Sequence, residues 1–438
     1  MSSFFQKAPS GWDRVPLKFL IEGSKNGAWG GEAGTDQIDA ICVRVADFDW
    51  QRLRLDLSDP TTRSFGSDQF RRLALRDGDL VLEKSGGGEK TPVGRVVMFS
   101  GSESSVTSNF VSRVRPVSSV WPQFLLYMIA AQYMSGFSIQ FVKQNTGIQN
   151  LDDAALFRSD VWVPARTTQK AIADFLDRET ARIDQLVAKR SRFAELLLER
   201  RLAVIAKAIT GTTDDAPWLQ SLPEGWKAER AKVHFHESQE RSTTGEEELL
   251  TVSHITGVTK RSEKDVYMFM AESNEGYKLV SPGDLIINTM WAWMGAMGVS
   301  SEHGLISPSY GVYSPASDAL RPAFVDLMVR SKPFVAEATR RSKGIHSSRL
   351  RLYPDAFLDM RLPIPPLQTQ DKLLIEVSSR TQREDELLRK NARAETLLRE
   401  FRSALITAAV TGQIDVATWG KQGQSDRRLD EIEEAMQA

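Results

Sequence analysis

The sequence contains few of the residues on which disulfide, zinc and membrane proteins depend. Its 438 residues include one cysteine, Cys42, and five histidines. A single cysteine excludes an intramolecular disulfide and a thiolate zinc site, and it is typical of a reducing compartment. We interpret Cys42 as a buried residue. The longest apolar stretch, from Phe124 to Met134, is shorter than the roughly 20 residues of a bilayer span, so we expect a cytoplasmic protein.

Motifs for catalysis are also missing. The run SGGGEKT over Ser85–Thr91 resembles a phosphate-binding loop, but Glu89 stands where that motif needs glycine. The sequence has no G-x-G-x-x-G, G-x-S-x-G or H-E-x-x-H pattern and no adenine-methylation motif of the Asn/Asp-Pro-Pro-aromatic kind. His234 and His236 have no evident third metal ligand, and we interpret them as surface or core residues. We expect a chain that is not itself an enzyme and that binds no metal or cofactor.

The overall composition is that of a folded protein and says little about partners. Hydrophobic residues make up 41% of the chain and charged residues 26%, which is ordinary for globular proteins. With 56 Lys and Arg against 57 Asp and Glu, the net charge is -1, so only local clusters of basic residues could indicate nucleic-acid binding. The length predicts at least two hydrophobic cores.

The chain repeats itself at an offset of 201 residues. The segments Leu196–Gly211 and Leu397–Gly412 are identical at nine of sixteen positions, and Val161–Gln169 matches Leu362–Gln370 at the same offset. Upstream, Arg76–Lys84 (RDGDLVLEK) resembles Ser281–Thr289 (SPGDLIINT) with altered spacing. Each half is therefore a variable block followed by a more strongly repeated block.

The repeated blocks are predicted to be long helices. They lack Gly and Pro internally, carry apolar residues at helical spacing, and lie between a proline and a glycine. A helix of this length measures roughly 64 Å, and one apolar stripe cannot stabilise it alone. We therefore expect the two helices to pair antiparallel about a pseudo-two-fold axis. The predicted helix-pair interface consists of Leu176, Ile183, Leu186, Arg190, Phe193, Leu197, Val204, Val377, Leu387, Asn391, Ala394, Leu398 and Leu405.

Two polar residues occupy matching positions in this predicted interface. Arg190 and Asn391 lie near the middle of the helices, where a polar side chain can fix the register at a cost in stability. They could equally be solvated residues on a rotated face. The variable blocks carry short β-rich runs and one predicted helix each, Trp121–Gly136 and Arg321–Thr339, so each is predicted to be a small α+β domain.

Two surfaces could bind nucleic acid. The segment Arg340–Arg351 has five basic residues and no acid, a density suited to phosphate contact. Glycine-rich or aromatic loops follow the two GDL runs and offer base-edge donors and stacking faces. Trp291 and Trp293 could also be core residues. The candidate DNA-binding residues are Lys84, Ser85, Lys90, Arg95, Lys143, Asn145, Asn288, Trp291, Tyr310, Arg340, Arg341, Lys343, His346 and Arg349.

From Gly11 to Gly412 the sequence resembles the specificity subunit of type I restriction-modification systems. The resemblance rests on the proline-bearing entry followed by a long helix that ends in A-[IV]-T-G, which occurs twice, and on the GDL runs. It implies target-recognition domains at 1–165 and 213–364, spacer helices at 166–212 and 365–412, and a polar tail at 413–438. The fold class is then α+β, with two α/β target-recognition domains alternating with two helices that form an antiparallel coiled coil. A departure from the family pattern is Ala165, where a second proline is common.

The resemblance further implies a function in phage defence. Each recognition domain would read one half of a bipartite, asymmetric target in double-stranded DNA, and the helices would set the spacing and dock the partners. Those partners would be two adenine-methyltransferase (modification) subunits and two restriction-translocase subunits, which would carry S-adenosylmethionine, ATP and Mg. The alternatives are a recognition module of a related methylation-based defence system and a coiled-coil scaffold that binds no DNA.

Overall fold

The computed structural model describes residues 10–88, 91–145, 148–210, 219, 222–254, 256–263, 273–344, 350–419 and 423–437. The chain divides into two compact units: unit 1 comprises Met1–Ser191 and Lys390–Ala438, and unit 2 comprises Arg192–Arg389. Each unit therefore contains one half of each long helix. None of the helices in the described part of the chain combines the length and the low polarity that crossing a membrane requires.

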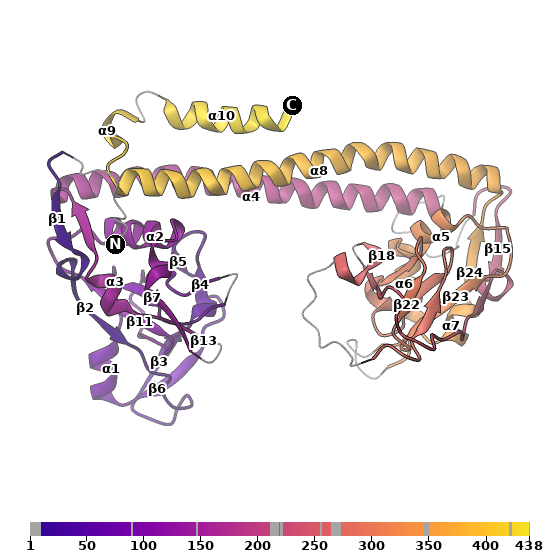
Figure 1. The fold of residues 1–438 in the computed structure, drawn as a ribbon, viewed down its shortest axis with the longest axis horizontal. Helices are drawn as coiled ribbons and strands as arrows, with labels where there is room; N and C mark the ends of the chain where they lie inside the picture. Colours follow the sequence, from indigo (N-terminus) through magenta and orange to yellow (C-terminus); the bar gives the residue numbers. More distant parts are fainter. Residues whose placement is uncertain are drawn as a thin grey trace. The chain divides into compact units, whose positions relative to one another are not determined.

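Unit 1 is built on a six-stranded sheet with the strand order β2-β11-β7-β9-β5-β4. Two three-stranded sheets, β10-β3-β6 and β12-β13-β8, and the pair β1-β14 complete it (Figure 1). The bounds are β1 Asp13–Pro16, β2 Ile21–Asn26, β3 Ile38–Val43, β4 Phe48–Asp49, β5 Arg54–Leu55, β6 Thr62–Phe65, α1 Ser67–Leu73, β7 Leu80–Glu83, β8 Ser85–Gly86, β9 Val96–Met98, β10 Ser105–Thr107, β11 Val111–Pro116, α2 Pro122–Met134, β12 Val142–Asn145, β13 Ile148–Leu151, α3 Asp153–Phe157 and β14 Asp160–Val163.

Unit 2 has a smaller central sheet with the order β16-β23-β20-β21 and three two-stranded sheets, β15-β24, β17-β18 and β19-β22. Its central strands follow the order of β2-β11-β7-β9 in unit 1, so the two domains share a sheet core. The bounds are β15 Lys227–Arg230, β16 Phe235–Glu237, β17 Leu250–Ser253, β18 Gly257–Lys260, β19 Lys278–Val280, β20 Leu285–Asn288, β21 Met297–Val299, β22 Gly304–Ile306, β23 Tyr310–Pro315, α5 Pro322–Val329, α6 Lys332–Arg341, α7 Pro354–Leu358 and β24 Arg361–Ile364.

The repeated GDL runs form the turns that enter the central strands β7 and β20. The carboxylate of Asp79 accepts a hydrogen bond from the Arg76 amide at 2.7 Å, and that of Asp284 accepts one from the Ser281 amide at 2.8 Å. The preceding glycines, at φ +83° and +95°, adopt the left-handed conformation that favours glycine. The motif therefore has a structural role in each unit.

One helix prediction was wrong. The segment 321–339 forms two helices, α5 and α6, rather than one. Ser331 interrupts it, because its Oγ donates to the Met328 carbonyl at 2.7 Å and accepts from the Phe334 amide at 3.4 Å. Pro333, in the first turn of α6, has no N–H to continue a helix from the preceding turn. The predicted helix at 121–136 is present as α2, whose middle is buried.

The two long helices are α4, Arg166–Thr210, and α8, Leu367–Val410. In unit 1, Arg402 Nε lies 3.0 Å from Asp184 Oδ1, and Asn391 Nδ2 donates to the Arg190 carbonyl at 3.0 Å. Rising numbers on α4 thus meet falling numbers on α8, so the helices are antiparallel. In unit 2 the other halves meet through an ion pair between Arg201 and Asp385. The predicted α+β fold with paired long helices is confirmed.

The two inter-helix ion pairs are copies of each other. Adding the repeat offset of 201 to Asp184 gives Asp385, and subtracting it from Arg402 gives Arg201. The same ion pair therefore recurs in unit 1 and unit 2. This recurrence agrees with a helix pair produced by duplication.

Most of the predicted interface side chains are removed from solvent. The buried ones are Leu176, Ile183, Leu197, Val377, Asn391, Ala394, Leu398 and Leu405. Half-buried are Leu186, Arg190, Val204 and Leu387, and Phe193 is 38% exposed. Asn391 Oδ1 has no hydrogen-bond partner among the described residues, which makes this polar position costly.

A repeated glutamine fastens each long helix to its domain. The Gln169 side chain accepts from the Trp121 amide at 2.8 Å and donates to the Pro164 carbonyl at 3.0 Å. In unit 2, Gln370 accepts from the Arg321 amide and donates to the Pro365 carbonyl, both at 2.8 Å. Trp121 and Arg321 precede the first residues of α2 and α5, so each glutamine satisfies a free helix N-terminus.

Candidate nucleic-acid interface

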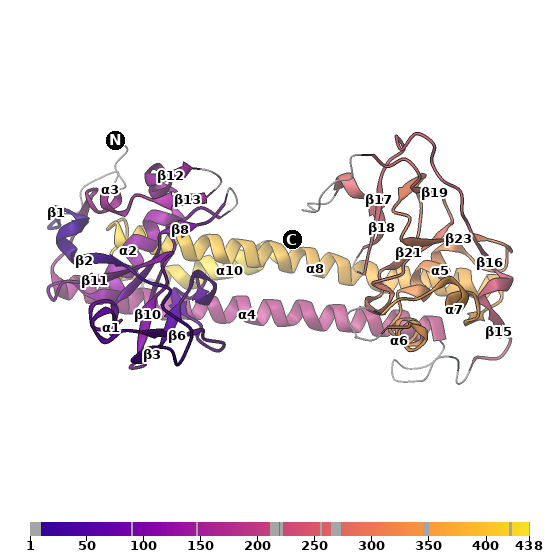
Figure 2. The ribbon, with the colours of Figure 1, turned by 90° about the horizontal axis from the view of Figure 1, so that it is seen from below.

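In unit 1, one small sheet brings the glycine-rich loop with Ser85 close to the strand that carries the candidates Lys143 and Asn145. Strand β8, in the glycine-rich loop, pairs with β13, which in turn pairs with β12 (Figure 2). Ser85 lies opposite Asn150, and its Oγ donates to Asn150 Oδ1 at 2.5 Å. Gly87 has φ +60°, and a Cβ there would lie 2.9 Å from the Thr91 carbonyl, so the loop requires glycine.

A cavity of about 540 Å³ opens beside this loop, and exposed aromatic side chains line it. Trp29 and Phe110 line the cavity with 41% and 45% of their surfaces exposed, together with Ser85, Arg44 and Arg95. Exposed aromatic rings beside a polar loop suit base stacking.

Sequence reasoning missed this aromatic pair. The guanidinium carbon of Arg63 lies 4.5 Å from the centroid of the Trp29 ring, a cation-π contact. A tryptophan within a glycine-rich run, GAWGG at Gly27–Gly31, was the available signal for Trp29. Phe110 had no signal that separates it from a core residue.

Three predicted cations of unit 1 that the structure describes, Lys84, Arg95 and Lys143, are paired with acids. Arg95 makes two hydrogen bonds to Glu83, at 2.8 and 3.0 Å, and this contact raises the pKa of the guanidinium. Lys84 lies 3.4 Å from Asp153, and Lys143 lies 2.7 Å from Asp152. These pairs hold the loop and the hairpin in place and reduce their positive potential.

The remaining predicted residues of unit 1 are Lys90 and Asn145. Lys90 lies outside the described residues. Asn145 ends strand β12, opposite Ile148, and its side chain is not described.

In unit 2, the loop after β20 presents aromatic and sulfur side chains to solvent. Asn288 is buried and its Oδ1 accepts a hydrogen bond from the Met290 amide at 3.2 Å, which shapes the start of the loop. Trp291 is 52% exposed, whereas the indole Nε1 of Trp293 donates to the Met290 carbonyl at 2.9 Å. Tyr310 lies opposite Asn288 in the sheet, and burial raises the pKa of its hydroxyl.

The basic segment of unit 2 lies against the same loop. Lys343 and Arg351 exchange two backbone hydrogen bonds of 2.9 Å, and the Leu352 amide donates to the Thr289 carbonyl at 2.9 Å. Arg351 Nη2 also lies 3.7 Å from the sulfur of Met290. The structure therefore brings the predicted phosphate-binding segment and the predicted stacking loop together. Met290 was not among the predicted site residues, and Arg351 was predicted only as part of the basic segment.

The remaining basic residues of this segment differ in their freedom to bind. Arg340 and Arg341 both hydrogen-bond to Glu337, at 2.7 and 2.6 Å, and the contact with Arg340 contributes most to lowering the pKa of that carboxyl. Lys343 is exposed, with no ion pair among the residues that the structure covers. His346 and Arg349 lie outside the described residues.

Other candidate chemical groups are structural. Burial raises the pKa of the Cys42 thiol to about 11, so it stays protonated at neutral pH. His234 is buried, with its ring nitrogens 2.8 Å from Ser317 Oγ and 3.0 Å from Glu229 Oε2. Within the described ranges, no group of three or more His, Cys, Asp or Glu side chains could hold a metal ion.

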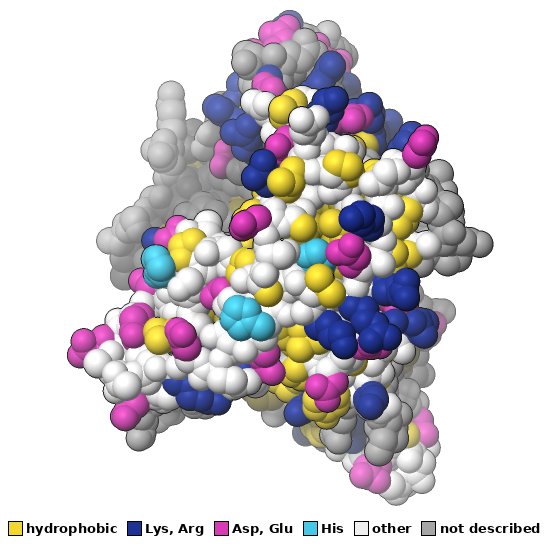
Figure 3. Space-filling model, turned by 90° about the vertical axis from the view of Figure 1, so that its right-hand side faces the viewer, with side chains coloured by type: hydrophobic (Ala, Val, Ile, Leu, Met, Phe, Trp, Pro, Cys, Tyr) yellow, Lys and Arg dark blue, Asp and Glu magenta, His cyan; other side chains and the backbone are white. Residues whose placement is uncertain are grey.

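The described side chains on the face drawn in Figure 3 carry charges of both signs. On the face drawn in Figure 3, groups of Lys and Arg side chains alternate with acidic ones and with exposed hydrophobic side chains. This distribution agrees with the net charge of -1. Attraction to a polyanion would therefore depend on local groups of basic residues.

Comparisons with known proteins agree with this architecture. Over 117 residues, 27% of this chain, the sequence is 25% identical to the type I restriction enzyme StySPI specificity subunit of Salmonella potsdam; the match spans 25% of that relative. A structure solved in a study of complex assembly and conformational transition of the type I R-M system covers 93% of this chain and 100% of its own, with 15% identity and a TM-score of 0.66. The chain resembles a type I specificity subunit in sequence over that segment, and its fold resembles that of a chain from a type I R-M system.

The resemblance inferred from the repeated blocks is thereby confirmed. The crystal structure of the HsdS subunit from Thermoanaerobacter tengcongensis also covers 93% of this chain and 98% of its own, at 15% identity and a TM-score of 0.47. No family model matches the sequence.

Proposed function

We propose that this chain is the DNA sequence-specificity subunit of a type I restriction-modification complex. Each target-recognition domain reads one half of a bipartite, asymmetric target in double-stranded DNA. The proposal rests above all on one contrast: the two units repeat their sheet core and their glutamine contacts to the long helices but differ in the loops beside the central strands. A scaffold that binds two copies of one ligand would have no reason to diverge there.

The two domains use different chemistry to read DNA in this proposal. In unit 1, Trp29 and Phe110 stack on nucleotides, and Ser85 with its neighbour Asn150 contacts base edges. In unit 2, Trp291 provides the stacking face, while Lys343 and Arg351 contact phosphates. Because the two domains present different side chains, they read different base sequences in the two half-sites.

The paired helices set the distance between the half-sites. The helix α4 has 45 residues, and at about 1.5 Å per residue it is longer than one helical turn of DNA, which measures about 34 Å. Lengthening both helices by four residues, next to Arg190 and Asn391, changes the spacer in the methylated motif. An unchanged spacer would contradict the proposal that the paired helices set the distance between the half-sites.

The catalytic activities of the complex reside on the partner subunits. Two adenine-methyltransferase subunits, docked on the helices, carry S-adenosylmethionine, and two restriction-translocase subunits carry ATP and Mg. This chain is a non-catalytic recognition subunit that acts on cytoplasmic DNA, with the recognition domains at 1–165 and 213–364, the spacer helices at 166–212 and 365–412, and the tail at 413–438.

Genome-wide mapping of methylated adenines, with and without this chain, tests the function. A bipartite motif that disappears without the chain supports it. A related defence module without a nuclease motor gives the same map but no cleavage of unmodified DNA. A DNA-free scaffold gives no motif and, with the methyltransferase present, no sequence-specific gel shift.

Phosphate contact is tested separately by salt dependence. Lys343→Ala lowers affinity on all sequences alike and reduces the slope of log affinity against log salt by about one. Lys189→Ala, an exposed lysine on α4, is the matched control and leaves the slope unchanged.

A further inference from the structure

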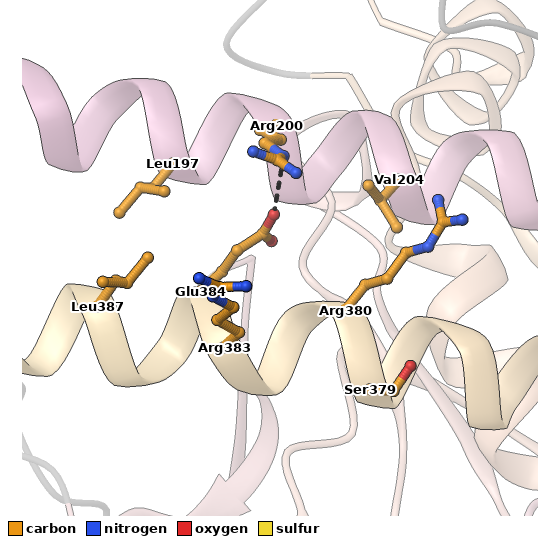
Figure 4. Close-up of a pocket in the computed structure, with 8 residues that line it drawn as sticks. All are labelled: Leu197, Arg200, Val204, Ser379, Arg380, Arg383, Glu384 and Leu387. Atoms are coloured by element: carbon orange, nitrogen blue, oxygen red, sulfur yellow. Dashed lines mark ion pairs between the residues drawn. The ribbon is translucent and has the colours of Figure 1, made fainter.

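A cavity inside the recognition domain of unit 1 differs from the groove between the long helices. In unit 2, α4 and α8 leave an open groove of about 570 Å³, in which Arg200 pairs with Glu384 at 3.3 Å (Figure 4). The proposed function already gives the surface of the long helices to the partner subunits. Among the described residues that line the cavity of about 540 Å³ beside the glycine-rich loop of unit 1, none belongs to either long helix. This cavity therefore belongs to the recognition domain alone.

The cavity of unit 1 has an aromatic rim and a charged floor. At the rim, Trp29 and Phe110 are 41% and 45% exposed. Glu83 also lines the cavity but is 1% exposed, and Arg95, which pairs with it, is 23% exposed. A flat ligand can therefore stack on the aromatic rings while one of its edges reaches the ion pair.

The ion pair fixes Arg95 and leaves part of its guanidinium free. Nε and Nη2 of Arg95 donate to the two carboxylate oxygens of Glu83 at 2.8 and 3.0 Å, which sets the plane of the guanidinium. Among the described residues Arg95 has no other hydrogen-bond partner, so Nη1 and the second N–H of Nη2 remain available as two adjacent donors.

Two adjacent donors in a fixed plane select a base by its acceptors. They match O6 and N7 of guanine, which arginine contacts through two parallel hydrogen bonds. An unpaired cytosine offers O2 and N3 to the same donors, but the larger face of a purine covers more of the aromatic rim. Guanine is therefore the base that fits both the rim and the floor.

The matching positions of unit 2 carry no such ion pair. The Glu83 amide, at the end of β7, donates to the Arg95 carbonyl at 2.8 Å, and the Asn288 amide, at the end of β20, donates to the Ala296 carbonyl at 3.0 Å. Asn288 and Ala296 thus occupy the sheet positions of Glu83 and Arg95. Because the same corner of the sheet forms in unit 2 without an ion pair, the shared sheet does not require the pair in unit 1.

A base that stays in the duplex does not fit this cavity. Neighbouring base pairs cover its two faces, and only its edge reaches a groove. The charged floor lies behind the aromatic rim, so the edge alone does not reach it. A base that has left the stack offers free faces to the rim and an edge to the floor. The volume of about 540 Å³ lies within the range of small-molecule sites, roughly 300–1,000 Å³.

We propose that the cavity of unit 1 binds one guanine that is extruded from the target duplex. Trp29 and Phe110 contact its faces, and Arg95, held by Glu83, donates to its O6 and N7. The inference rests on the proposed function for the duplex and adds to it that one half-site is read on an unpaired base. Because Ala296 replaces the arginine in unit 2, this reading occurs in the unit 1 half-site only.

Abasic substitution of the opposite strand tests the extrusion. In duplexes of the methylated motif, the nucleotide opposite each guanine of the unit 1 half is made abasic in turn, and fluorescence anisotropy gives the affinity of the chain with its methyltransferase partner. At one guanine we expect about tenfold tighter binding, because no base pair has to be broken. The same substitutions in the unit 2 half should not tighten binding. A unit 1 half without a guanine, or without any tightening opposite one, would overturn the proposal.

Variants connect the tightening to the cavity. Glu83→Asn combined with Arg95→Ala gives unit 1 the side chains of unit 2, and should abolish the tightening and weaken binding of the intact duplex about fivefold or more. Trp29→Ala and Phe110→Ala change exposed residues and should each reduce the tightening. Arg14→Ala, an ion-paired arginine of unit 1 that does not line the cavity, is the matched control and should keep it. Full tightening in the double variant would contradict the role of the ion pair.

Deoxyguanosine monophosphate tests the cavity without a duplex. By equilibrium dialysis, it should bind the full-length chain at least about fivefold more tightly than the thymidine or deoxycytidine monophosphate, and the double variant should lose this preference. Equal binding of the three nucleotides would overturn the guanine assignment. Preference for the guanine nucleotide without any sequence-specific duplex binding would overturn the proposed function and leave the guanine site. Sequence-specific duplex binding without tightening would overturn the extruded guanine alone.

Discussion

Unit 1 and unit 2 share their anchoring contacts and differ on their surfaces. Both keep the aspartate turn before the central strand, the glutamine at the start of a long helix, and the Asp–Arg ion pair between the helices. They differ at surface positions of the long helices. Ile183 and Phe401, part of the apolar core of unit 1, correspond to Glu384 and Arg200 in the open groove of unit 2.

This difference shows which contacts the duplicated architecture needs. The retained contacts satisfy helix termini or join the two helices, and these tasks are the same in both halves. The divergent positions lie in the loops beside the central strands and on the long helices, where the proposed function gives each half its own ligand.

Removing the repeated glutamines should have the largest effect. Gln370→Leu leaves the Arg321 amide and the Pro365 and Ala319 carbonyls without their partner, and should cost about 2–4 kcal/mol of unfolding free energy. Gln169→Leu removes fewer contacts and should cost less. Urea unfolding gives the size, and hydrogen exchange shows which unit opens. Gln185→Leu, at an exposed α4 position, should leave stability unchanged; an equal loss there would contradict the assignment.

The two copies of the inter-helix ion pair should differ in strength. Arg402 and Asp184 are 9% and 20% exposed, whereas Arg201 and Asp385 are 35% and 43% exposed. Arg402→Met should therefore cost about 2–3 kcal/mol and Arg201→Met less than about 1 kcal/mol. Double-mutant cycles with the two aspartates measure each coupling. A larger coupling for the more exposed pair would reverse the comparison.

The exposed aromatics should separate the two half-sites. Trp291→Ala should lower affinity for the specific duplex by about 1–3 kcal/mol through lost stacking and relax selectivity at one half only. Trp29→Ala should do the same at the other half. Gel shifts with duplexes altered in one half at a time give the readout. Phe19→Ala, 63% exposed and not among the residues that line the cavity beside Trp29, serves as the control. Equal effects of Trp291→Ala on both halves would count against separate readers.

The Asp177 carboxyl of unit 1 makes stability depend on pH at a position where unit 2 has no ionisable side chain. Burial raises the pKa of Asp177, which accepts a hydrogen bond from the Tyr127 hydroxyl at 2.7 Å, whereas the matching residue of unit 2 is Ser378. Because the folded-state pKa lies above the unfolded value, this group favours folding at low pH, and its contribution is lost as pH rises through the folded pKa.

Replacing that carboxyl tests the sign. Asp177→Asn should reduce the fall in unfolding free energy between about pH 4 and about pH 7, measured as urea midpoints of the variant and the unchanged chain. The same pH profile for both proteins would show that Asp177 does not contribute.

The sequence predicted the features that repeat. The matching blocks were sufficient to predict the two long helices, because Gly and Pro are excluded from both. It also placed the strands that follow the GDL runs. It failed at the break between α5 and α6, since Ser331 and Pro333 stop the helix through local hydrogen bonding that apolar periodicity does not reveal.

The binding surfaces were less predictable. The sequence shows two basic residues in the glycine-rich loop of unit 1, Lys84 and Arg95. It does not show that Asp153 and Glu83 lie beside them, because these ion pairs depend on how the sheets fold. Exposed Trp29 and Phe110 have the same residue types as core aromatics. The basic segment lies near the Trp291 loop because the Leu352 amide donates a hydrogen bond to the Thr289 carbonyl. The sequence does not reveal this long-range contact.

The central claim is that one chain carries two independent readers on a shared helix pair. The most direct measurement is methylated-adenine mapping after residues 1–165 are exchanged for the corresponding block of another specificity subunit. The account predicts a new sequence in one half of the motif, with the other half and the spacer unchanged. A motif that changes in both halves, or in neither, would contradict it.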